Sequence, residues 1–586
     1  MRQAEKILDY AKLVVLGIKN LQFFHIGSLP KLFHRASLPE KRIFIGAVAM
    51  LVASVVYLII GSFRQATVAV ADFGGKYTEG LVGQPRFINP ALAIANDVDL
   101  DISRVVFSGL YKFNAQQELV PDLAKSLPAI SPDQKQYTIE LRTDATWHDG
   151  QPFDADDVIF TTQLIQNPLY QSPLRFNWNR VEVNKLDEHK ILVSLKEPSA
   201  PFVSNLTQGI LPKHIWERVE PGNFVLSKFN LQPIGTGPFV VKHLKKSDEG
   251  AIVSLTLAAF EQYAPQRPYL NELEFKFFES YDDLISAYHS KDVTGLGYVP
   301  FDKKIYLEKS SRINLYYLSL PRYQALFLNR QASPVLADKN VRAALAQSLN
   351  RQEIINEVYL GFARPAYGPV PPGYLGYNSG VEQAHRFNLT NAKNLLAQSG
   401  FAPVEGSAVL KKGTVDLAFT VTTDNFPLNV KTAELLKKQW EKIGFQINLQ
   451  ILTLGELQQD RIANREYESL LFSENVGADP DPYPFWHSSQ RTDPGLNLSS
   501  FASKEADALI TEARTNADPA YRAARYLRFQ ELIVDDVPAI FIANSLFVYG
   551  VDTKIMGIAL QNIVDQSQRF LNVEQWYLKT KRQLKK

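Results

Sequence analysis

Residues 137–161 read YTIELRTDATWHDGQPFDADDVIFT, and this stretch indicates the fold class. Its first six residues alternate between apolar and polar side chains, which is typical of a half-buried strand. Asp149-Gly150 is a turn signal. Asp154 is a good helix N-cap, because Asp157 stands where a capping box needs it, and the helix should continue to about Ile165. A strand, a turn and a helix in succession predict an α/β architecture.

Signals for the beginning and end of helices recur along the chain. Asp338 is placed to cap another helix. Gly400 and Gly444 each follow a helical pattern, and glycine at this position ends a helix in the left-handed region. Residues 445–452, FQINLQIL, then read as a buried strand. Helices and strands therefore alternate through the body of the chain.

Length and composition narrow the function classes. The chain has 586 residues, too many for one core, so two or three domains are expected. Residues 1–42 carry eight Lys or Arg and three acids, whereas the net charge of the whole chain is only +2. The body is therefore slightly acidic and shows no nucleic-acid footprint. The absence of cysteine excludes disulfides, thiolate metal sites and a lipid-modified cysteine anchor.

Residues 43–61 form a run of 19 residues without a charge, long enough nearly to span a membrane. The basic residues precede this run, so the positive-inside rule places the N-terminus in the cytoplasm and the C-terminal body outside. A cleaved signal peptide is the alternative, with Ala69-Val70-Ala71 as its cleavage site. Because the apolar run is longer than a signal core and the triplet lies well beyond it, we expect an uncleaved, single-pass anchor in the cell membrane.

Several short motifs resemble catalytic or metal-binding sites, but a structural role explains them better. His148 and Asp149 adjoin Trp147, but we expect them to fix a turn by hydrogen bonding. Asp97, Asp99 and Asp101 alternate as in a calcium loop, yet the positions that need Gly and Glu hold other residues, so we expect a solvated strand or loop edge. No HExxH, GxSxG or Walker A pattern occurs. We therefore expect a protein that is not an enzyme and holds no metal or cofactor.

A series of short blocks resembles one family, the extracellular solute-binding proteins for oligopeptides, dipeptides and nickel that serve ABC transporters. The resemblance extends over residues 74–577. The blocks that carry it are Val120–Ala124, Trp147–Phe153, Asp156–Thr161, Gly209–His214, Gly235–Phe239, Lys339–Leu345, Asp481–Tyr483 and Val537–Ile540.

The resemblance implies a two-lobed periplasmic-binding-protein-like α/β fold with an extra inserted domain, here preceded by one transmembrane helix. The expected parts are a cytoplasmic basic segment 1–42, an anchor 43–61, lobe I at 74–107, 213–321 and 541–580, an inserted subdomain at 108–212, and lobe II at 322–540. A ligand would be enclosed between the lobes as they close about a hinge.

The resemblance also implies a function and partners. We expect a short peptide as ligand, ABC permease and ATPase subunits as partners, and a monomer. A nickel complex, haem or an oligosaccharide is an alternative ligand. A surface sensor that keeps the fold without transport is an alternative of a different class.

The most informative site segment is residues 474–487, ENVGADPDPYPFWH. In peptide-binding relatives a carboxylate in this loop pairs with the amino terminus of the ligand, and simple register places Val476 at that position. Because valine has no carboxylate, this role applies here only if a neighbouring acidic residue takes the place of Val476. The candidate ligand-binding residues are Glu474, Asp479, Asp481, Tyr483, Trp486 and His487. Among the acids we favour Asp479 or Asp481, because the Asp-Pro repeat restricts their backbone.

Overall fold

The computed structural model describes residues 37–264 and 266–585, so most of the predicted cytoplasmic segment lies outside the described residues. The chain forms two compact units. Among the described residues, one unit holds 37–71 together with 580–585, and the other holds Asp72–Lys579.

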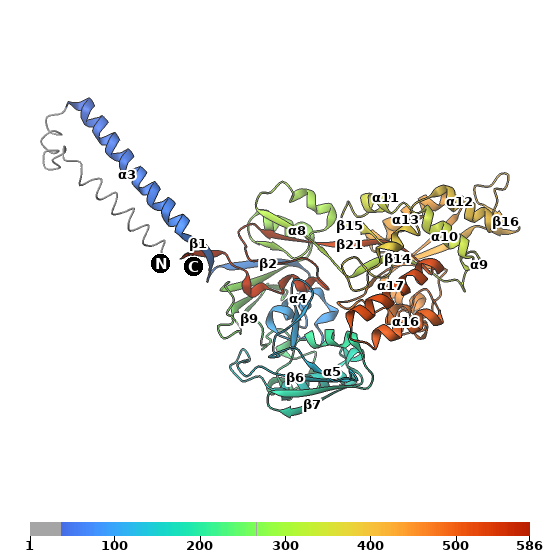
Figure 1. The fold of residues 1–586 in the computed structure, drawn as a ribbon, viewed down its shortest axis with the longest axis horizontal. Helices are drawn as coiled ribbons and strands as arrows, with labels where there is room; N and C mark the ends of the chain where they lie inside the picture. Colours follow the sequence, from blue (N-terminus) through green and yellow to red (C-terminus); the bar gives the residue numbers. More distant parts are fainter. Residues whose placement is uncertain (1–36, 265, 586) are drawn as a thin grey trace. The chain divides into compact units, whose positions relative to one another are not determined.

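The smaller unit contains the predicted anchor. Helix α3 runs over Leu38–Ala66, begins at a capping box between Ser37 and Glu40, and has no buried residue. Of the helices that the structure describes, it alone is long and apolar enough to cross a membrane. Strand β1 (Thr67–Asp72) follows α3 without a linker and pairs with β22 (Lys579–Leu584) near the C-terminus (Figure 1).

The larger unit is built on one twelve-stranded sheet, in which β21 is shared by two halves (Figure 1). We call the half with β12, β2, β11, β10 and β9 lobe I, and the half with β14, β20, β18 and β19 lobe II. Strands β13 (Ile313–Ser319) and β15 (Ala363–Pro365) also pair with β21. The strands are, in spatial order, β19 (Gln446–Leu452), β18 (Ala418–Asp424), β20 (Ser469–Asn475), β14 (Arg322–Leu328), β21 (Ala539–Asp552), β12 (Gly295–Leu296), β2 (Lys76–Val82), β11 (Glu272–Phe278), β10 (Ile252–Ala259) and β9 (Phe239–Lys246).

A separate sheet lies in the predicted inserted subdomain, and helices occur in both halves of the larger unit. That sheet has four strands, in the order β5 (Ala129–Ile130), β6 (Gln136–Glu140), β8 (Lys190–Leu195) and β7 (Val181–Asp187). The main helices are α4 (Asp97–Val106), α5 (Ala155–Gln166), α8 (Tyr281–His289), α10 (Lys339–Ser348), α11 (Arg351–Glu357), α12 (Leu389–Gln398), α13 (Pro427–Glu441), α16 (Lys504–Arg514) and α17 (Pro519–Asp536). The domain boundaries given above stay a prediction.

Lobe II has an apolar core on each face of its sheet, as the period of two along a strand requires. Leu326 and Leu328 of β14 belong to the core that contains Trp440. Ala325 and Phe327 belong to the core that contains Trp486.

Several local predictions are confirmed. Asp154 caps α5 and forms the capping box with Asp157. Asp338 caps α10. Gly400 and Gly444 take the left-handed conformation that the two helix ends require, with φ of +86° and +95°.

The Trp-His-Asp-Gly segment is a structural turn, as expected. Nδ1 of His148 accepts a hydrogen bond from the backbone N–H of Gly235 at 3.2 Å, and Nε2 lies 2.9 Å from the carbonyl oxygen of Gly237. Burial lowers the pKa of His148 to about 4, so the ring is neutral at pH 7. Asp149 accepts from the backbone N–H of Gln151 at 3.2 Å.

Two predictions are wrong. Asp97, Asp99 and Asp101 do not form a solvated strand or loop edge, because Asn96 caps helix α4 there and Asp99 and Asp101 are buried. Asp101 meets the guanidinium of Arg569 at 2.7 Å, a partner that is remote in sequence. The strand that ends at Leu452 is not a buried strand, because β19 is the edge of the sheet and Ile447 is its only buried residue.

Candidate functional site

The candidate site lies where the parallel strands of both lobes end. In lobe I, β2 runs parallel to β11 and β12, and in lobe II, β18 runs parallel to β19 and β20. Leu296 of β12 pairs with Gly550 of β21, and Asn475 of β20 pairs with Arg322 of β14, both in antiparallel register. Because of these registers, the carboxyl ends of both sets point toward the stretch where β14 and β21 cross between the lobes. Ligands of α/β proteins bind beyond the carboxyl ends of the strands.

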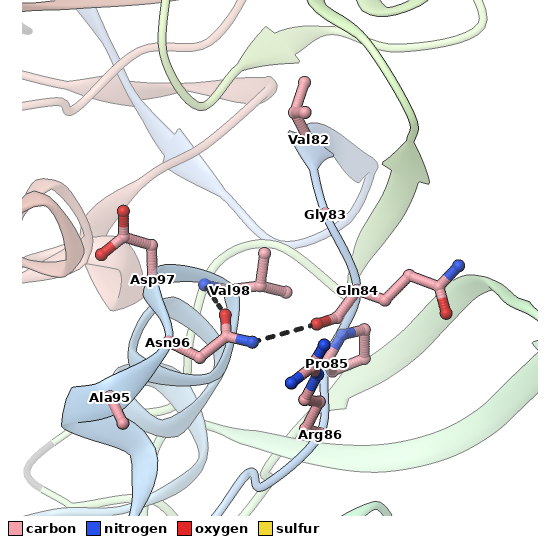
Figure 2. Close-up of a pocket in the computed structure, with 9 residues that line it drawn as sticks. All are labelled: Val82, Gly83, Gln84, Pro85, Arg86, Ala95, Asn96, Asp97 and Val98. Atoms are coloured by element: carbon pink, nitrogen blue, oxygen red, sulfur yellow. Dashed lines mark hydrogen bonds between the residues drawn. The ribbon is translucent and has the colours of Figure 1, made fainter. Parts of the chain in front are cut away.

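On the lobe I side, an open pocket of about 610 Å³ lies directly after β2. It is lined by residues 82–86, which leave the strand, and residues 95–98, which begin α4 (Figure 2). Asn96 joins the two segments: its Oδ1 accepts from the backbone N–H of Val98 at 2.9 Å, and its Nδ2 donates to the carbonyl oxygen of Gln84 at 3.3 Å (Figure 2). The exposed side chains of Arg86 and Asp97 give the pocket both signs of charge.

Aromatic rings continue from lobe I toward the crossing strands. Tyr281 and Tyr298 meet edge to face with ring centroids 5.7 Å apart, and Tyr298 lies 5.3 Å from Phe547 of β21. Burial raises the pKa of Tyr298 to about 12, and Tyr281 adds to that rise whereas Arg322 opposes it. Phe547 is buried, whereas Tyr281 and Tyr298 are partly exposed and offer apolar rings with polar edges, as ligand pockets commonly do.

On the lobe II side, hydrogen bonds connect a crossing strand to the carboxyl end of β18. The hydroxyl of Tyr359 donates to Oε1 of Gln324 at 3.0 Å, and Nε2 of Gln324 donates to Oδ1 of Asn429 at 2.7 Å. Nδ2 of Asn429 in turn donates to Oδ1 of Asp424 at 2.9 Å. This network fixes the start of α13 against β14. It leaves Phe426, 61% exposed, at the same edge.

Glu474, the first of the predicted ligand residues, is the penultimate residue of β20. It is buried opposite Tyr323 of β14, whose hydroxyl donates to its Oε2. Its other carboxyl oxygen has no hydrogen-bond partner. Burial raises the pKa of Glu474 to about 8, so this side chain is largely neutral at pH 7 and a poor partner for an ammonium group.

Asp479 and Asp481 each meet an arginine of a neighbouring helix. Asp479 pairs with Arg522 of α17, whose side chain is only 7% exposed. Asp481 lies 3.1 Å from Arg514 of α16, whose side chain is 32% exposed, and also accepts from the backbone N–H of Tyr483. Burial raises the pKa of Asp481, and Arg514 opposes that rise. The Arg522 pair is therefore held tightly, whereas Arg514 has room to move.

The three predicted aromatic residues divide between surface and core. Tyr483 and His487 stack with centroids 4.2 Å apart, and the guanidinium of Arg514 lies 4.4 Å from the Tyr483 ring centre. Trp486 is 1% exposed and packs against Phe541 of β21 in the lobe II core. The structure thus brings Asp481, Tyr483 and His487 together with Arg514 and places Trp486 beneath them.

Sequence reasoning missed the lobe I pocket and the Tyr359–Asp424 network. A signal for the pocket was present, because Gly83 directly follows strand β2 and the good N-cap Asn96 comes shortly after. The network had no signal in the sequence, because Gln324, Tyr359 and the pair Asp424 and Asn429 come from three separate stretches of the chain. In the described ranges, 37–264 and 266–585, no group of three or more His, Asp or Glu side chains is arranged to hold a metal ion.

Comparison with known proteins places this geometry in a family. Residues 118–496 match the family model described as bacterial extracellular solute-binding proteins, family 5 Middle, over more than half of the chain. The oligopeptide-binding protein AppA of Bacillus subtilis is 26% identical over 513 residues, which cover 86% of this chain and 92% of AppA. The dipeptide-binding protein of Escherichia coli is 28% identical over 511 residues, which cover 81% and 90% of the two chains.

Solved structures that resemble this chain are binding proteins of the same kind. AppA of Bacillus subtilis in complex with a nonapeptide has a TM-score of 0.68 at 25% identity and covers 87% of this chain and 100% of its own. The ABC transporter substrate-binding protein CtaP of Listeria monocytogenes has a TM-score of 0.74 at 27% identity, over 86% and 100% of the chains. These relatives are two-lobed binding proteins of transporters rather than enzymes, so the predicted fold class is confirmed. The chain belongs to family 5 of the bacterial extracellular solute-binding proteins.

Proposed function

We propose that this protein is the membrane-tethered binding subunit of an ABC importer and captures short peptides between its two lobes. The observation that carries the proposal is the opposed pair of carboxyl edges, bridged by β14 and β21, in a member of a family whose relatives bind peptides. Ligand held at both edges would draw the lobes together, because each edge alone covers only one side of it. The permease and ATPase partners follow from the role of the family.

The start of the ligand site on lobe I is the pocket between residues 82–86 and 95–98. Here the chain is exposed beyond β2, so an extended peptide can add its backbone to the segment, with side chains in the surrounding space. Arg86 and Asp97 offer contacts to the charged groups of a peptide. The aromatic series that includes Tyr281 and Tyr298 would contact apolar side chains.

The loop of residues 474–487 would supply the lobe II side. Of its three carboxylates, Asp481 best suits a ligand ammonium, because its partner Arg514 is partly exposed and can yield the carboxylate. Asp479 would position the loop through Arg522, and Glu474 would do so through Tyr323.

The tether is helix α3. Its apolar run 43–61 has no buried residue, and the helix continues without a break into the paired strand β1. Signal-peptide cleavage after Ala71 would remove all of β1 except Asp72 and leave β22 without this partner strand. We therefore propose that the mature chain keeps Met1 or Arg2 at its N-terminus. N-terminal sequencing that finds Asp72 instead would contradict the tether.

Calorimetry and small-angle scattering of the full chain with short peptides test the binding function. A peptide that binds should make the protein more compact and raise its melting temperature, because it binds only the native state. Replacing Gln84 at the pocket by Trp should weaken binding about tenfold by filling the space, a loss of about 1.4 kcal/mol. Gln116→Trp, at another exposed glutamine, is the matched control.

Two results would refute this function. The first is a peptide library that yields no ligand by either measurement. The second is a peptide that binds equally well to the wild type and to Gln84→Trp without compaction, which would place binding away from the cleft.

A further inference from the structure

The C-terminal strand forms a ribbon with the segment that follows the membrane helix. Strand β22 pairs with β1, and the backbone N–H of Lys585 donates to the carbonyl oxygen of Ala66, the last residue of α3, at 3.0 Å. Nη1 of Arg582 lies 3.4 Å from the carbonyl oxygen of Arg64 and 3.3 Å from Oγ1 of Thr67. The end of the chain is therefore bound to the end of the helix.

The ribbon combines basic and apolar side chains. The last eight residues, KTKRQLKK, include five Lys or Arg, and no acid occurs among them. All six residues of β22 are exposed. Exposed apolar side chains accompany the basic ones: Phe63 is 55%, Val68 is 47% and Leu584 is 72% exposed. Basic residues next to exposed apolar groups are typical of segments that lie at a membrane interface.

The length of the helix sets how far this ribbon can be from the bilayer. The apolar run ends at Gly61 and the helix at Ala66, so at 1.5 Å per residue β1 begins about 8 Å beyond the hydrocarbon core. A headgroup layer is about 5–8 Å thick on each side, by the difference between the total and hydrocarbon thicknesses of a bilayer. The ribbon therefore starts at the headgroups, within about one Debye length of their charge at 0.15 M salt.

We propose that the β1–β22 ribbon is a membrane-contact surface that binds anionic lipid headgroups through the basic C-terminal strand. This inference rests on the proposed membrane tether, because α3 must span the bilayer for the ribbon to reach it. The basic side chains of β22 contact lipid phosphates, and Leu584 and Val68 enter the interface beside them. This contact holds the β1–β22 ribbon at the membrane surface.

The absence of cysteine makes a site-specific test direct. The full chain, with Gln583→Cys carrying a fluorophore, is reconstituted in vesicles of phosphatidylcholine alone or with 30% phosphatidylglycerol. Quenching by a neutral lipid that bears a nitroxide on its headgroup reports contact with the surface. We expect quenching to rise about twofold in anionic vesicles and to fall back in 0.5 M NaCl, because salt screens the contact.

Two controls separate a specific contact from a general charge effect. The triple variant Lys579→Gln, Lys581→Gln and Lys585→Gln should lose the increase. Removing three exposed lysines of lobe II, with Lys431→Gln, Lys438→Gln and Lys442→Gln, should keep it. A fluorophore at Leu186→Cys, on exposed strand β7, should show no dependence on lipid charge.

The outcomes distinguish this inference from the tether. Protein that does not float with the vesicles after alkaline carbonate treatment would overturn both. Floated protein whose Gln583 label is quenched equally in neutral and anionic vesicles would overturn the headgroup contact and leave the tether intact. An increase that persists in the β22 triple variant would likewise overturn the role of the basic strand.

Discussion

The pair of Asp479 and Arg522 gives the sharpest test of the loop at residues 474–487. Asp479→Asn removes the charge and keeps the size of the side chain, and it leaves the guanidinium of Arg522 with a neutral acceptor. The side chains of Asp479 and Arg522 are 14% and 7% exposed, so water cannot replace the lost charge well. Arg522 also donates to the hydroxyl of Tyr526 at 3.0 Å, which keeps the guanidinium in place.

The expected cost follows from this burial. Breaking a buried ion pair by removing one partner costs about 3–5 kcal/mol. We expect about 3 kcal/mol for Asp479→Asn, at the lower end, because the amide still accepts a hydrogen bond. Arg522→Met should cost about 2 kcal/mol, because the more exposed Asp479 can take up water. The double variant should cost less than the sum by about 2 kcal/mol, which is the coupling energy of contacting charges.

Urea unfolding of the full chain, followed by tryptophan fluorescence, measures these free energies, since Trp486 and Trp440 report on the lobe II cores. Calorimetry with free and N-acetylated forms of one peptide measures the ligand contact. Asp479→Asn should change affinity for both forms equally, whereas Asp481→Asn should lose affinity for the free amine alone. Additive costs of the two single variants would refute the ion pair. If Asp479, Asp481 and Glu474 variants all bind both forms like the wild type, the loop is only a structural turn.

Two further predictions concern buried groups. The pKa of Glu474 is raised to about 8 by burial, so its neutral form stabilises the fold below its unfolded pKa, and that contribution is lost as pH rises from about 4.5 to about 8. In urea unfolding between pH 4.5 and pH 8, the free energy of unfolding of the wild type should fall with pH, and Glu474→Gln should reduce this slope by up to about 1.4 kcal/mol per pH unit. An unchanged slope would contradict the raised pKa of Glu474. Gly295→Ala should destabilise lobe I by at least about 2 kcal/mol, because its Cβ would lie 1.7 Å from the Tyr77 hydroxyl. Gly222→Ala, where the new Cβ meets nothing within 4 Å, is the control, and equal melting temperatures for the two variants would refute the clash.

Helix caps and turns could be predicted well, because each depends on a few residues that are adjacent in the sequence. The capping of α5 by Asp154 and Asp157, the turn at His148 and the glycine ends at Gly400 and Gly444 each depend on a few consecutive residues. The apolar helix near the N-terminus was equally accessible, since an uncharged run of this length is a local property of the sequence. The family followed from motifs that recur in order along the chain.

Partners that are distant in sequence could not be predicted. The alternation of Asp97, Asp99 and Asp101 indicated a solvated edge. Nothing in the neighbouring sequence indicated that Asp101 would be buried and would form an ion pair with Arg569. The same holds for the candidate site. The composition of the loop suggested carboxylates available to a ligand, whereas α16 and α17 place an arginine against each of its two aspartates.

By itself, then, the sequence determined the apolar N-terminal helix, the α/β class, several helix ends and the family, because periodicity, capping and motif order are properties of neighbouring residues. Only the tertiary structure decided which charges are buried, which carboxylates already have partners, and that the basic strand β22 joins the end of helix α3. These outcomes depend on strand pairing and helix packing between segments up to about 500 residues apart, whose free energy comes from contacts that local sequence does not specify.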